Sequence, residues 1–566
     1  MLGSALACVL LAVSPPAAAQ MQTFWGDGTG DWFNAANWSA GVPNSNITAK
    51  INNGGTAQIG AAGAAASDLD LGVDTAHTGT VAIDGSGELS IGAILDVGVN
   101  GTGTLNITNG GAVSAPDHCW IAEGAGSNGT VTVDGAGSTL TVNNELKVGF
   151  FGTGTLSISN GGTVFGGRRG LNATAFVGDY EGSQGTVTVD GTGSKWTSGF
   201  VQVGRAASGT LSIINGGSVV SNGCYIGEGI GSHGSVIVDG LGSSWALRNL
   251  IVVGDDGAGS LQITNGGAVS TVSDSWIGYQ ASSSGTVTLD GPSSTWSHEG
   301  SLVIDGTSIV QISNGGTLSV CGNFACIACE SSSQSTVTVD GPGTNWTNSE
   351  NLFVGGSPLG DGGTGVLHID NGATVTAANL TVYEPGTLTG SGFVDATSAT
   401  ALEGTLAPDQ TISFTGNLAF GATATMLSTV TPTSADSAFV EGTATLNGTL
   451  GVTLTGGPFP VGTQYVLLQA TGGLNGTTFS TVSINAPPGV NPQVTYDTNH
   501  VYLVIEPSEA MPILSPKRHA IPRANPMPRL PRFVPAIVPC SPSPTPIRPT
   551  PTPRPRPTPM SRGTLP

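Results

Sequence analysis

The sequence predicts an all-β fold, a right-handed parallel β-helix, and three observations carry this prediction. A short strand pattern that ends in Asn-Gly or Asp-Gly recurs at steps of 24 to 31 residues. Gly contributes 88 of the 566 residues, and no stretch shows the 3.6-residue periodicity of an amphipathic helix. Apolar residues still make up 38% of the chain, enough to fill one long interior core.

The repeat is defined by corner residues that alternate between Asn and Asp. They are Asp84, Asn109, Asp134, Asn160, Asp190, Asn215, Asp239, Asn265, Asp290, Asn314, Asp340 and Asn371. A step of about 25 residues suits one coil of a solenoid, with coils stacked at roughly 4.8 Å. Asn and Asp tolerate left-handed backbone angles, and Gly adopts them without steric cost. The alternation also separates like carboxylates by two coils, roughly 9.6 Å.

Residues 1–19 are predicted to be a secretory signal peptide. An apolar run from Ala5 to Val13 is followed by Ser-Pro-Pro and three small residues, Ala17 to Ala19. The basic residues that normally precede such a run are missing, so whether this start is genuine stays open. Export is the expectation, and no transmembrane span is predicted in the mature chain.

Residues 20–69 are predicted to be an N-terminal cap. Trp25, Trp32, Phe33 and Trp38 cluster there and do not follow the repeat. Aromatic clusters of exported proteins can bind sugars, but the open end of a solenoid needs bulk to cover its core and strand edges. We favour the cap.

Residues 70–400 are predicted to be the β-helix, built from coils of about 25 residues in six repeats of about 50. A second landmark, an apolar-x-apolar-Gly strand, falls once per coil, as at Val97-Gly98 and Val203-Gly204. Alternation along each strand sends every second side chain inward. Four Trp residues recur at steps of 49, 51 and 50, and we expect them to pack in the core: Trp196, Trp245, Trp296 and Trp346.

Two segments complete the chain. Residues 401–506 lose the 25-residue spacing but keep alternating runs such as Ala444–Leu454, which predicts a C-terminal β cap or sandwich-like segment. Residues 507–566 hold 19 of the 34 prolines and predict a disordered Pro/Arg-rich tail. Whether this tail is genuine, or a bare linker or the product of a shifted reading frame, is left open.

The charge is divided between a strongly acidic body and a basic tail. Residues 507–566 carry nine of the 16 Lys and Arg and one of the 37 acidic residues, which gives the tail +8 (9 − 1) and the body −29 (7 − 36). An acidic body argues against nucleic acid as a partner. It is expected of a secreted, soluble protein.

The repeat resembles a known one. Gly-Thr-apolar-x-apolar-x-Asn-Gly-Gly, followed by Gly-Thr-Val-x-Val-Asp-Gly-x-Gly-Ser-x-Trp, is similar to the repeat associated with type V secretion (autotransporter) and PEP-CTERM proteins, most clearly over residues 154–196, 209–245 and 259–296. The resemblance implies an exported or surface-displayed bacterial β-helix with no assigned activity. The Pro-rich end departs from it, because it lacks both the C-terminal β-barrel of autotransporters and the apolar helix of PEP-CTERM proteins.

No catalytic, cofactor-binding or metal-binding residue is predicted. The nearest acidic clusters, Asp255-Asp256 and Asp179 with Glu181, are expected to be solvated loops. Cys321, Cys326 and Cys329 have the C-x4-C-x2-C spacing of an iron–sulfur loop but lack a fourth ligand at suitable distance. For these three we favour one local disulfide with a spare thiol, or three free thiols.

Two further cysteines, Cys119 and Cys224, are expected to point inward about four coils apart, roughly 19 Å, too far to pair.

The repeat, the export signal and the missing catalytic set predict an exported bacterial surface or extracellular protein, structural or adhesin-like and not an enzyme. Its partner is unknown; a host or matrix protein or a glycan is expected. The alternative is a carbohydrate-binding or polysaccharide-degrading β-helix, supported by fold analogy. Ice binding is a third alternative, because Thr130/Thr132, Thr186/Thr188, Thr286/Thr288 and Thr336/Thr338 form rows that Asn106, Ser212, Gln262 and His368 interrupt.

Overall fold

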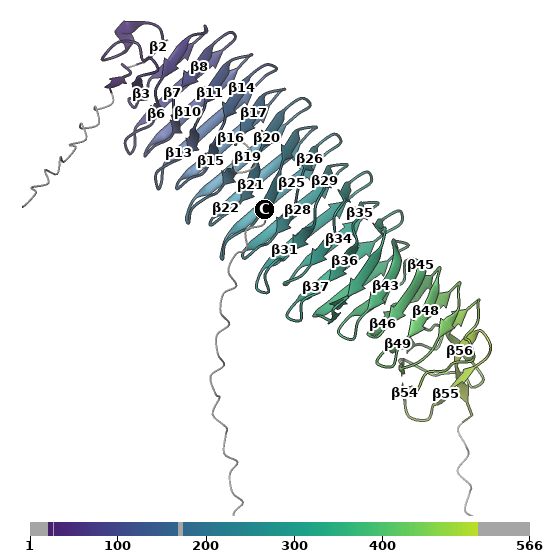
Figure 1. Ribbon diagram of the computed structural model, residues 1–566. Coiled ribbons are helices and arrows are strands. Elements are labelled where there is room, and N and C mark those ends of the chain that lie inside the picture. Colours follow the sequence, from purple (N-terminus) through teal and green to yellow (C-terminus); the bar gives the residue numbers. More distant parts are fainter. Residues whose placement is uncertain (1–20, 27, 168–173, 508–566) are drawn as a thin grey trace, which may run out of the picture. The chain divides into compact units, whose positions relative to one another are not determined.

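The computed structural model describes residues 21–26, 28–167 and 174–507, which all lie within one compact unit. The predicted signal peptide and nearly all of the Pro-rich tail lie outside these residues. The described chain is a parallel β-solenoid in which each coil contributes one strand to each of three hydrogen-bonded ladders (Figure 1). The prediction of a parallel β-helix is confirmed.

The first ladder holds the seven-residue strands of the repeat, which end at or next to the Asn and Asp corners, and their shorter counterparts in the other coils. Its members are β2 (Thr29–Asp31), β4 (Thr56–Ile59), β7 (Thr78–Asp84), β10 (Thr102–Thr108), β13 (Asn128–Asp134), β16 (Thr153–Ser159), β19 (Gln184–Asp190), β22 (Ser208–Ile214), β25 (His233–Asp239), β28 (Ala258–Thr264), β31 (Ser284–Asp290), β34 (Ile309–Ser313), β37 (Gln334–Asp340), β42 (Thr364–Asp370), β44 (Thr387–Gly390), β46 (Thr405–Pro408), β49 (Thr425–Val430), β52 (Thr449–Leu454) and β54 (Thr481–Asn485).

The second ladder follows the corner and carries the Trp row. Its members are β5 (Ala64–Ala66), β8 (Glu88–Ile91), β11 (Ala112–Ala115), β14 (Thr139–Val142), β17 (Thr163–Gly166), β20 (Lys195–Ser198), β23 (Ser218–Ser221), β26 (Ser244–Leu247), β29 (Ala268–Thr271), β32 (Thr295–His298), β35 (Thr317–Val320), β38 (Asn345–Asn348), β47 (Thr411–Phe414), β50 (Ser437–Val440) and β53 (Gln464–Ala470). Two long strands, β43 (Thr374–Val382) and β45 (Phe393–Leu402), run through both the second and the third ladder.

The third ladder closes each coil. Its other members are β1 (Met21–Phe24), β3 (Ile47–Ile51), β6 (Leu69–Leu71), β9 (Ile94–Val97), β12 (His118–Ile121), β15 (Glu145–Val148), β18 (Thr174–Val177), β21 (Phe200–Val203), β24 (Gly223–Ile226), β27 (Ile251–Val253), β30 (Ser275–Ile277), β33 (Leu302–Ile304), β36 (Phe324–Ile327), β39 (Asn351–Val354), β48 (Asn417–Phe420) and β51 (Ala444–Thr445). The apolar-x-apolar landmark of the sequence is this strand.

The interior is one continuous apolar core. In β10 the side chains alternate, with Leu105 and Ile107 fully buried and the residues between them partly exposed. The four repeating Trp side chains are at most 1% exposed, as predicted for core residues. Two of them find hydrogen-bond acceptors on the neighbouring coil, Trp245 Nε1 donating to Ser221 Oγ and Trp296 Nε1 to Thr271 Oγ1.

The solenoid extends beyond both predicted boundaries. Strands β1 to β6 of the predicted N-terminal cap (20–69) already pair in the ladders, and η1 (Ala35–Asn37) lies between β2 and β3. Trp25, Trp32 and Trp38 are buried there in edge-to-face contacts of 4.8 and 4.9 Å, so their rings do not form an open sugar platform.

At the other end, parallel pairing continues through the predicted C-terminal segment (401–506) as far as β54. The 25-residue spacing disappears because the coils there become irregular in length, not because the solenoid ends. Antiparallel strands β55 (Asn491–Tyr496) and β56 (His500–Glu506) then cover β53. Residues 401–506 are therefore mostly solenoid rather than a separate sandwich.

The corners link successive coils through side chains. Each Asn amide of the repeat donates to the carboxylate of the Asp one coil earlier, at 2.6 to 2.8 Å: Asn109 to Asp84, Asn160 to Asp134, Asn215 to Asp190, Asn265 to Asp239, Asn314 to Asp290 and Asn371 to Asp340. The carboxylates are thus paired as well as separated. Hydrogen bonds to charged groups are among the stronger ones in proteins.

The two corner types use different residues for the left-handed turn. The six Asn residues have φ between 50° and 52°, as expected. The expectation that Asp does the same is wrong: each Asp ends its strand, and the following Gly has φ between 59° and 94°. A Ser four residues after the Asp then closes the turn. The Ser138 hydroxyl, for example, donates a hydrogen bond to the Asp134 carbonyl and accepts one from the backbone N–H of Gly110.

Replacement of a corner Asn tests this link. We expect Asn265→Ala to lower the free energy of unfolding by about 1–3 kcal/mol, because it removes the bond to Asp239 and places Ala at positive φ. Asn265→Gly removes the same bond but keeps the backbone angle without strain, so it should cost less than Asn265→Ala. Urea unfolding followed by circular dichroism measures both; a Gly variant as stable as the wild type would show that the amide contributes nothing.

Candidate functional site: a grooved aromatic face

The third ladder presents a row of side chains that point away from the core, and five of the thirteen are aromatic. The middle residue of each strand points outward, and the register of the ladder stacks these residues one coil apart. From β3 to β39 they are Lys50, Asp70, Asp96, Trp120, Lys147, Phe176, Gln202, Tyr225, Val252, Trp276, Val303, Cys326 and Phe353.

Neighbouring positions on the same strands and in the loops that follow add further rings. We call the whole set the aromatic face, which comprises Trp120, Phe150, Phe151, Phe176, Tyr180, Phe200, Tyr225, Trp276, Tyr279, Phe324, Phe353 and Tyr383. Phe151, Tyr180 and Tyr279 are exposed, whereas Phe353 is buried beneath its neighbours. Exposed aromatic rings are characteristic of binding sites, because they offer large contact area at low entropic cost.

The aromatic face was not predicted from the sequence. The apolar-x-apolar-Gly landmark served only to establish the length of a coil, and the aromatic residues considered were those of the buried Trp row. The signal was the x of that same landmark, which is Trp120, Phe176, Tyr225 and Trp276 in every second coil from β12 to β30.

One end of the row is acidic, and its Asp96 carboxyl is buried. Asp96 is 8% exposed, and its Oδ1 has no hydrogen-bond partner in the described part of the chain. Burial, with smaller contributions from Glu123 and Asp70, raises the pKa of Asp96 to about 9. Lys50 pairs with Asp70 at 3.1 Å and does not reach Asp96 in an ion pair.

The middle of the row is held by an ion cluster over three coils. The Asp179 carboxylate is fully buried, 2.9 Å from Lys147 Nζ, and accepts a hydrogen bond of 2.8 Å from Arg205 Nη1. Lys147 also lies 3.9 Å from the centroid of the Phe150 ring. The predicted solvated role of Asp179 is therefore wrong, since it anchors the cations that pack against the aromatic rings.

A groove opens in the aromatic face where one loop is short. Val287, Val310 and Val337 are equivalent positions of neighbouring coils, as are Ile277, Ile304 and Ile327. Val310 follows Ile304 by only six positions, whereas in the flanking coils the same two positions are ten apart. The middle loop therefore falls short of its neighbours and leaves a notch between them.

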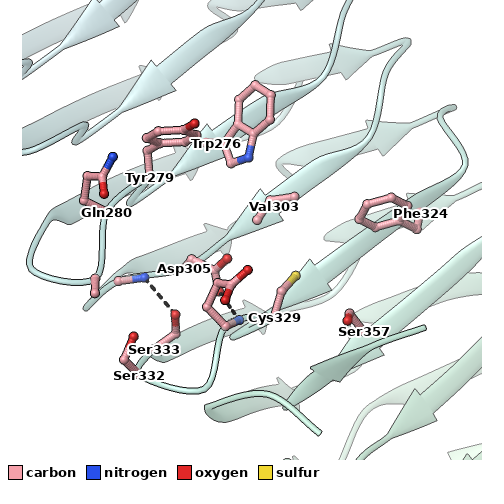
Figure 2. A pocket seen from close by; sticks show the side chains of 13 residues that line it. Trp276, Tyr279, Gln280, Val303, Asp305, Phe324, Cys329, Ser332, Ser333 and Ser357 are labelled. Carbon is pink, nitrogen blue, oxygen red and sulfur yellow. Dashed lines mark hydrogen bonds between the residues drawn. The ribbon is translucent and has the colours of Figure 1, made fainter. Parts of the chain in front are cut away.

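The notch is a groove of about 520 Å³, within the usual range of ligand sites. Figure 2 shows Trp276, Tyr279 and Gln280 on one side of Val303 and Phe324 on the other. The Trp276 and Tyr279 rings meet edge to face at 5.5 Å, and Tyr279 is 49% exposed. The groove thus offers rings of differing orientation within one cavity.

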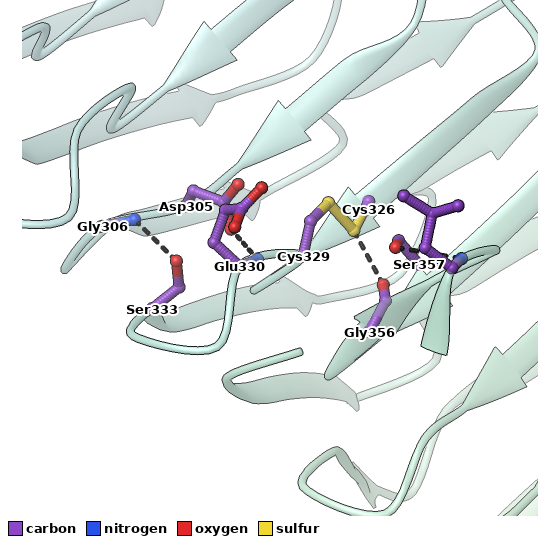
Figure 3. The surroundings of a disulfide bond; sticks show 9 residues. Asp305, Gly306, Cys326, Cys329, Glu330, Ser333, Gly356 and Ser357 are labelled. Atoms are coloured by element: carbon purple, nitrogen blue, oxygen red, sulfur yellow. Dashed lines mark hydrogen bonds between the residues drawn. A yellow bond between two sulfur atoms is a disulfide. The ribbon is translucent and has the colours of Figure 1, made fainter. Parts of the chain in front are cut away.

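Polar groups line the floor and the far wall. The Glu330 backbone N–H donates to Asp305 Oδ1 at 3.2 Å, and Gly306 N donates to Ser333 Oγ at 3.2 Å (Figure 3). Burial raises the pKa of Asp305, although the hydrogen bond from the Glu330 backbone N–H opposes the shift. Asp305 stands where most coils have Gly after the third strand.

The cysteines match the expectation of one local disulfide and a spare thiol. Cys326 of β36 is bonded to Cys329, which precedes Glu330 in the wall of the groove (Figure 3), while Cys321 is exposed and free. Cys119 and Cys224 are buried, as expected.

Other predicted features lie apart from the groove. Asp255 and Asp256 occupy one loop, where burial and then Asp256 raise the pKa of Asp255 to about 6. Among the described residues no group of three or more His, Cys, Asp or Glu side chains is placed to hold a metal ion. No helix in that part of the chain is long and apolar enough to span a membrane.

The Thr rows lie on a different ladder. Thr104, Thr130, Thr155, Thr186 and Thr210 are stacked in register on the outward side of the first ladder. The adjoining row is interrupted, for example by Ile237 and Gln262, so the paired Thr array required for the ice-binding alternative is broken.

The fold and the face define a parallel β-helix repeat protein with a grooved aromatic surface. No protein-family model matches the chain. It is 45% identical over 98 residues to the uncharacterized lipoprotein YdeK of Escherichia coli (strain K12) and 35% identical over 98 residues to the adhesin BmaC autotransporter of Brucella suis biovar 1 (strain 1330).

Each match covers 17% of this chain, and the chain spans only 7% and 3% of these relatives. The crystal structure of the Haemophilus influenzae Hap adhesin aligns with 82% of this chain and 60% of its own, at 12% identity and a TM-score of 0.28. That likeness is too low to carry an argument.

Disruption of the ion cluster should show its structural weight. Asp179→Asn leaves the buried Lys147 ammonium with the partly exposed Glu145 carboxylate, 3.5 Å away, as its remaining counter-charge, and we expect a loss of about 1.5–3 kcal/mol in the free energy of unfolding. Lys147→Met leaves Arg205 to neutralise Asp179 and should cost clearly less. Thermal and urea unfolding measure the difference; a milder effect of Asp179→Asn would contradict the assignment.

Asp96 should make stability depend on pH. The unfolded chain loses this proton near pH 3.8, whereas the folded chain keeps it to about 9, so the folded state binds more protons in between. Stability therefore falls as pH rises through this window, by at most about 1.4 kcal/mol per pH unit. We expect Asp96→Asn to unfold at a higher temperature than the wild type at pH 8 and at a similar temperature at pH 4.

The exposed Asp361 provides the control, since Asp361→Asn should leave the difference between the two pH values unchanged.

Proposed function

We propose that this chain is an exported bacterial surface or extracellular protein of adhesin type, which binds a partner through its aromatic face and performs no catalysis. The observation that carries the proposal is the alignment of aromatic side chains along the outside of a rigid ladder. Structural packing does not require it, because the core is already filled from the inward positions.

The relatives support this assignment. One is named an adhesin and autotransporter, the other a lipoprotein, and both names describe proteins of the bacterial envelope or surface. The shared part is confined to 98 residues in each case, so the agreement does not extend to a partner. A solenoid suits such a role, because stacked coils present an extended surface on a stiff support.

Removal of rings from the face tests the proposal. We expect the full chain to bind at least one surface in a panel of host cells, matrix proteins and immobilised glycans. A variant with Trp120→Ala, Tyr225→Ala and Trp276→Ala should lose about tenfold or more in affinity, as is typical when aromatic hot spots are truncated.

A matched variant removes three exposed apolar side chains of other surfaces, Leu241→Ala, Leu427→Ala and Val482→Ala, and should bind like the wild type. Equal binding by both variants would remove the face from the proposal.

The polysaccharide-degrading alternative rests on the presence of Asp305 and Glu330 in one groove. Carboxylate pairs serve as acid and base in glycoside hydrolysis. Asp305, however, is 5% exposed and held by a backbone N–H, which leaves Glu330 as the exposed acid. Incubation with neutral and acidic polysaccharides should release no new reducing ends or unsaturated products.

A further inference from the structure

We infer that the groove between β30 and β36 is a binding subsite for an uncharged oligosaccharide. This inference rests on the proposed function and names the class of ligand that the aromatic face would bind. Trp276, Tyr279 and Phe324 would contact the apolar faces of pyranose rings. The polar groups along the floor and wall would accept or donate hydrogen bonds to sugar hydroxyls.

The shape of the groove supports a chain of sugar rings rather than a compact ligand. Its two walls belong to coils that flank the short loop, so they stand about two ladder spacings apart, roughly 9.6 Å. Val303 lies between them and is only half-buried. A groove of this width, open to solvent and floored by a small side chain, accommodates a sugar ring stacked between aromatic walls.

The polar lining favours hydroxyl groups. Glu330 is exposed, and its carboxylate is acceptor-only when ionised, which suits the O–H donors of a sugar. Gln280 on the opposite wall both donates and accepts, and Ser332 adds an exposed hydroxyl. Hydrogen-bond donors and acceptors beside the aromatic rings of both walls are the usual composition of a site that fixes a polyhydroxylated ligand.

The charge of the groove excludes acidic glycans. Two carboxylates, Asp305 and Glu330, line the cavity, and no Lys, Arg or His side chain does. A uronate or sulfate group would meet like charges without a counter-ion, which disfavours binding. The cationic groups of the aromatic face, Lys147 and Arg205, are already paired with Asp179 several coils away.

The disulfide fits the same role. Cys326 and Cys329 tie β36 to the start of the loop that carries Glu330 and Ser333. A wall fixed in this way loses less conformational entropy when a ligand binds.

Titration of the full chain with neutral oligosaccharides tests the inference. The probes are β- and α-linked oligomers of glucose, galactose and N-acetylglucosamine, with oligogalacturonate as the acidic comparison. Calorimetry and tryptophan fluorescence should show saturable binding of at least one neutral series and none of oligogalacturonate. Trp276→Ala should lower the affinity at least about tenfold.

Two further variants separate loss of the site from loss of the fold. Val303→Trp fills the groove while it keeps every aromatic and polar side chain of the lining, and it should abolish binding, while its unfolding temperature stays near that of the wild type. Leu427→Ala removes an exposed apolar side chain that lies outside the aromatic face, and it should bind as the wild type does.

The outcomes are distinct. Absence of binding by every neutral series, or equal binding by wild type and Val303→Trp, overturns the sugar subsite. If adhesion to the wider panel persists in that case, the proposed surface function stands on another ligand. If adhesion fails as well while the protein remains folded, both proposals fall.

Discussion

Parallel backbone pairing between successive coils is the constraint on which every other feature depends. It fixes equivalent residues one above another at a single spacing, so any property of one coil becomes a row along the molecule. Apolar residues become a continuous core, the Asn and Asp corners become a chain of hydrogen bonds, and outward rings become the aromatic face. A side chain that occurs in one coil alone forms no such row.

Loop length is the variable that this constraint leaves free. Because strands cannot shift register without exposing the core, changes in chain length are absorbed in the loops between the ladders. The short loop after Ile304 creates the groove, and the hairpin of β40 (Gly356–Ser357) and β41 (Gly360–Asp361) occupies the corresponding place two coils later. A surface site is thereby built without any change to the core.

The fold was predictable because its signal repeats. Asn109, Asp134 and their counterparts mark the coil length, and the same spacing places Trp196 and Trp245 in the core. The ends were predicted less well: residues after 400 keep the ladders although their coils vary in length, and spacing alone cannot detect irregular coils. The groove was not predicted because it depends on one loop that is shorter than its neighbours. The aromatic face was not predicted because outward positions are not restricted to apolar residues and so show no regular pattern along the strand.

The direction of the corner bonds divides the solenoid into units of two coils. An Asn amide reaches back to the Asp coil before it, whereas the link from an Asn coil forward to the next Asp coil uses a backbone N–H and a Ser hydroxyl, as at Gly161 and Ser194. If one coil were lost, two Asp corners or two Asn corners would become neighbours. Two carboxylates would then lie next to each other, or two amides would, and neither pair could form the Asn–Asp hydrogen bond. Gene duplications and deletions that preserve the fold should therefore occur in even numbers of coils, so that the natural quantum of length variation is about fifty residues.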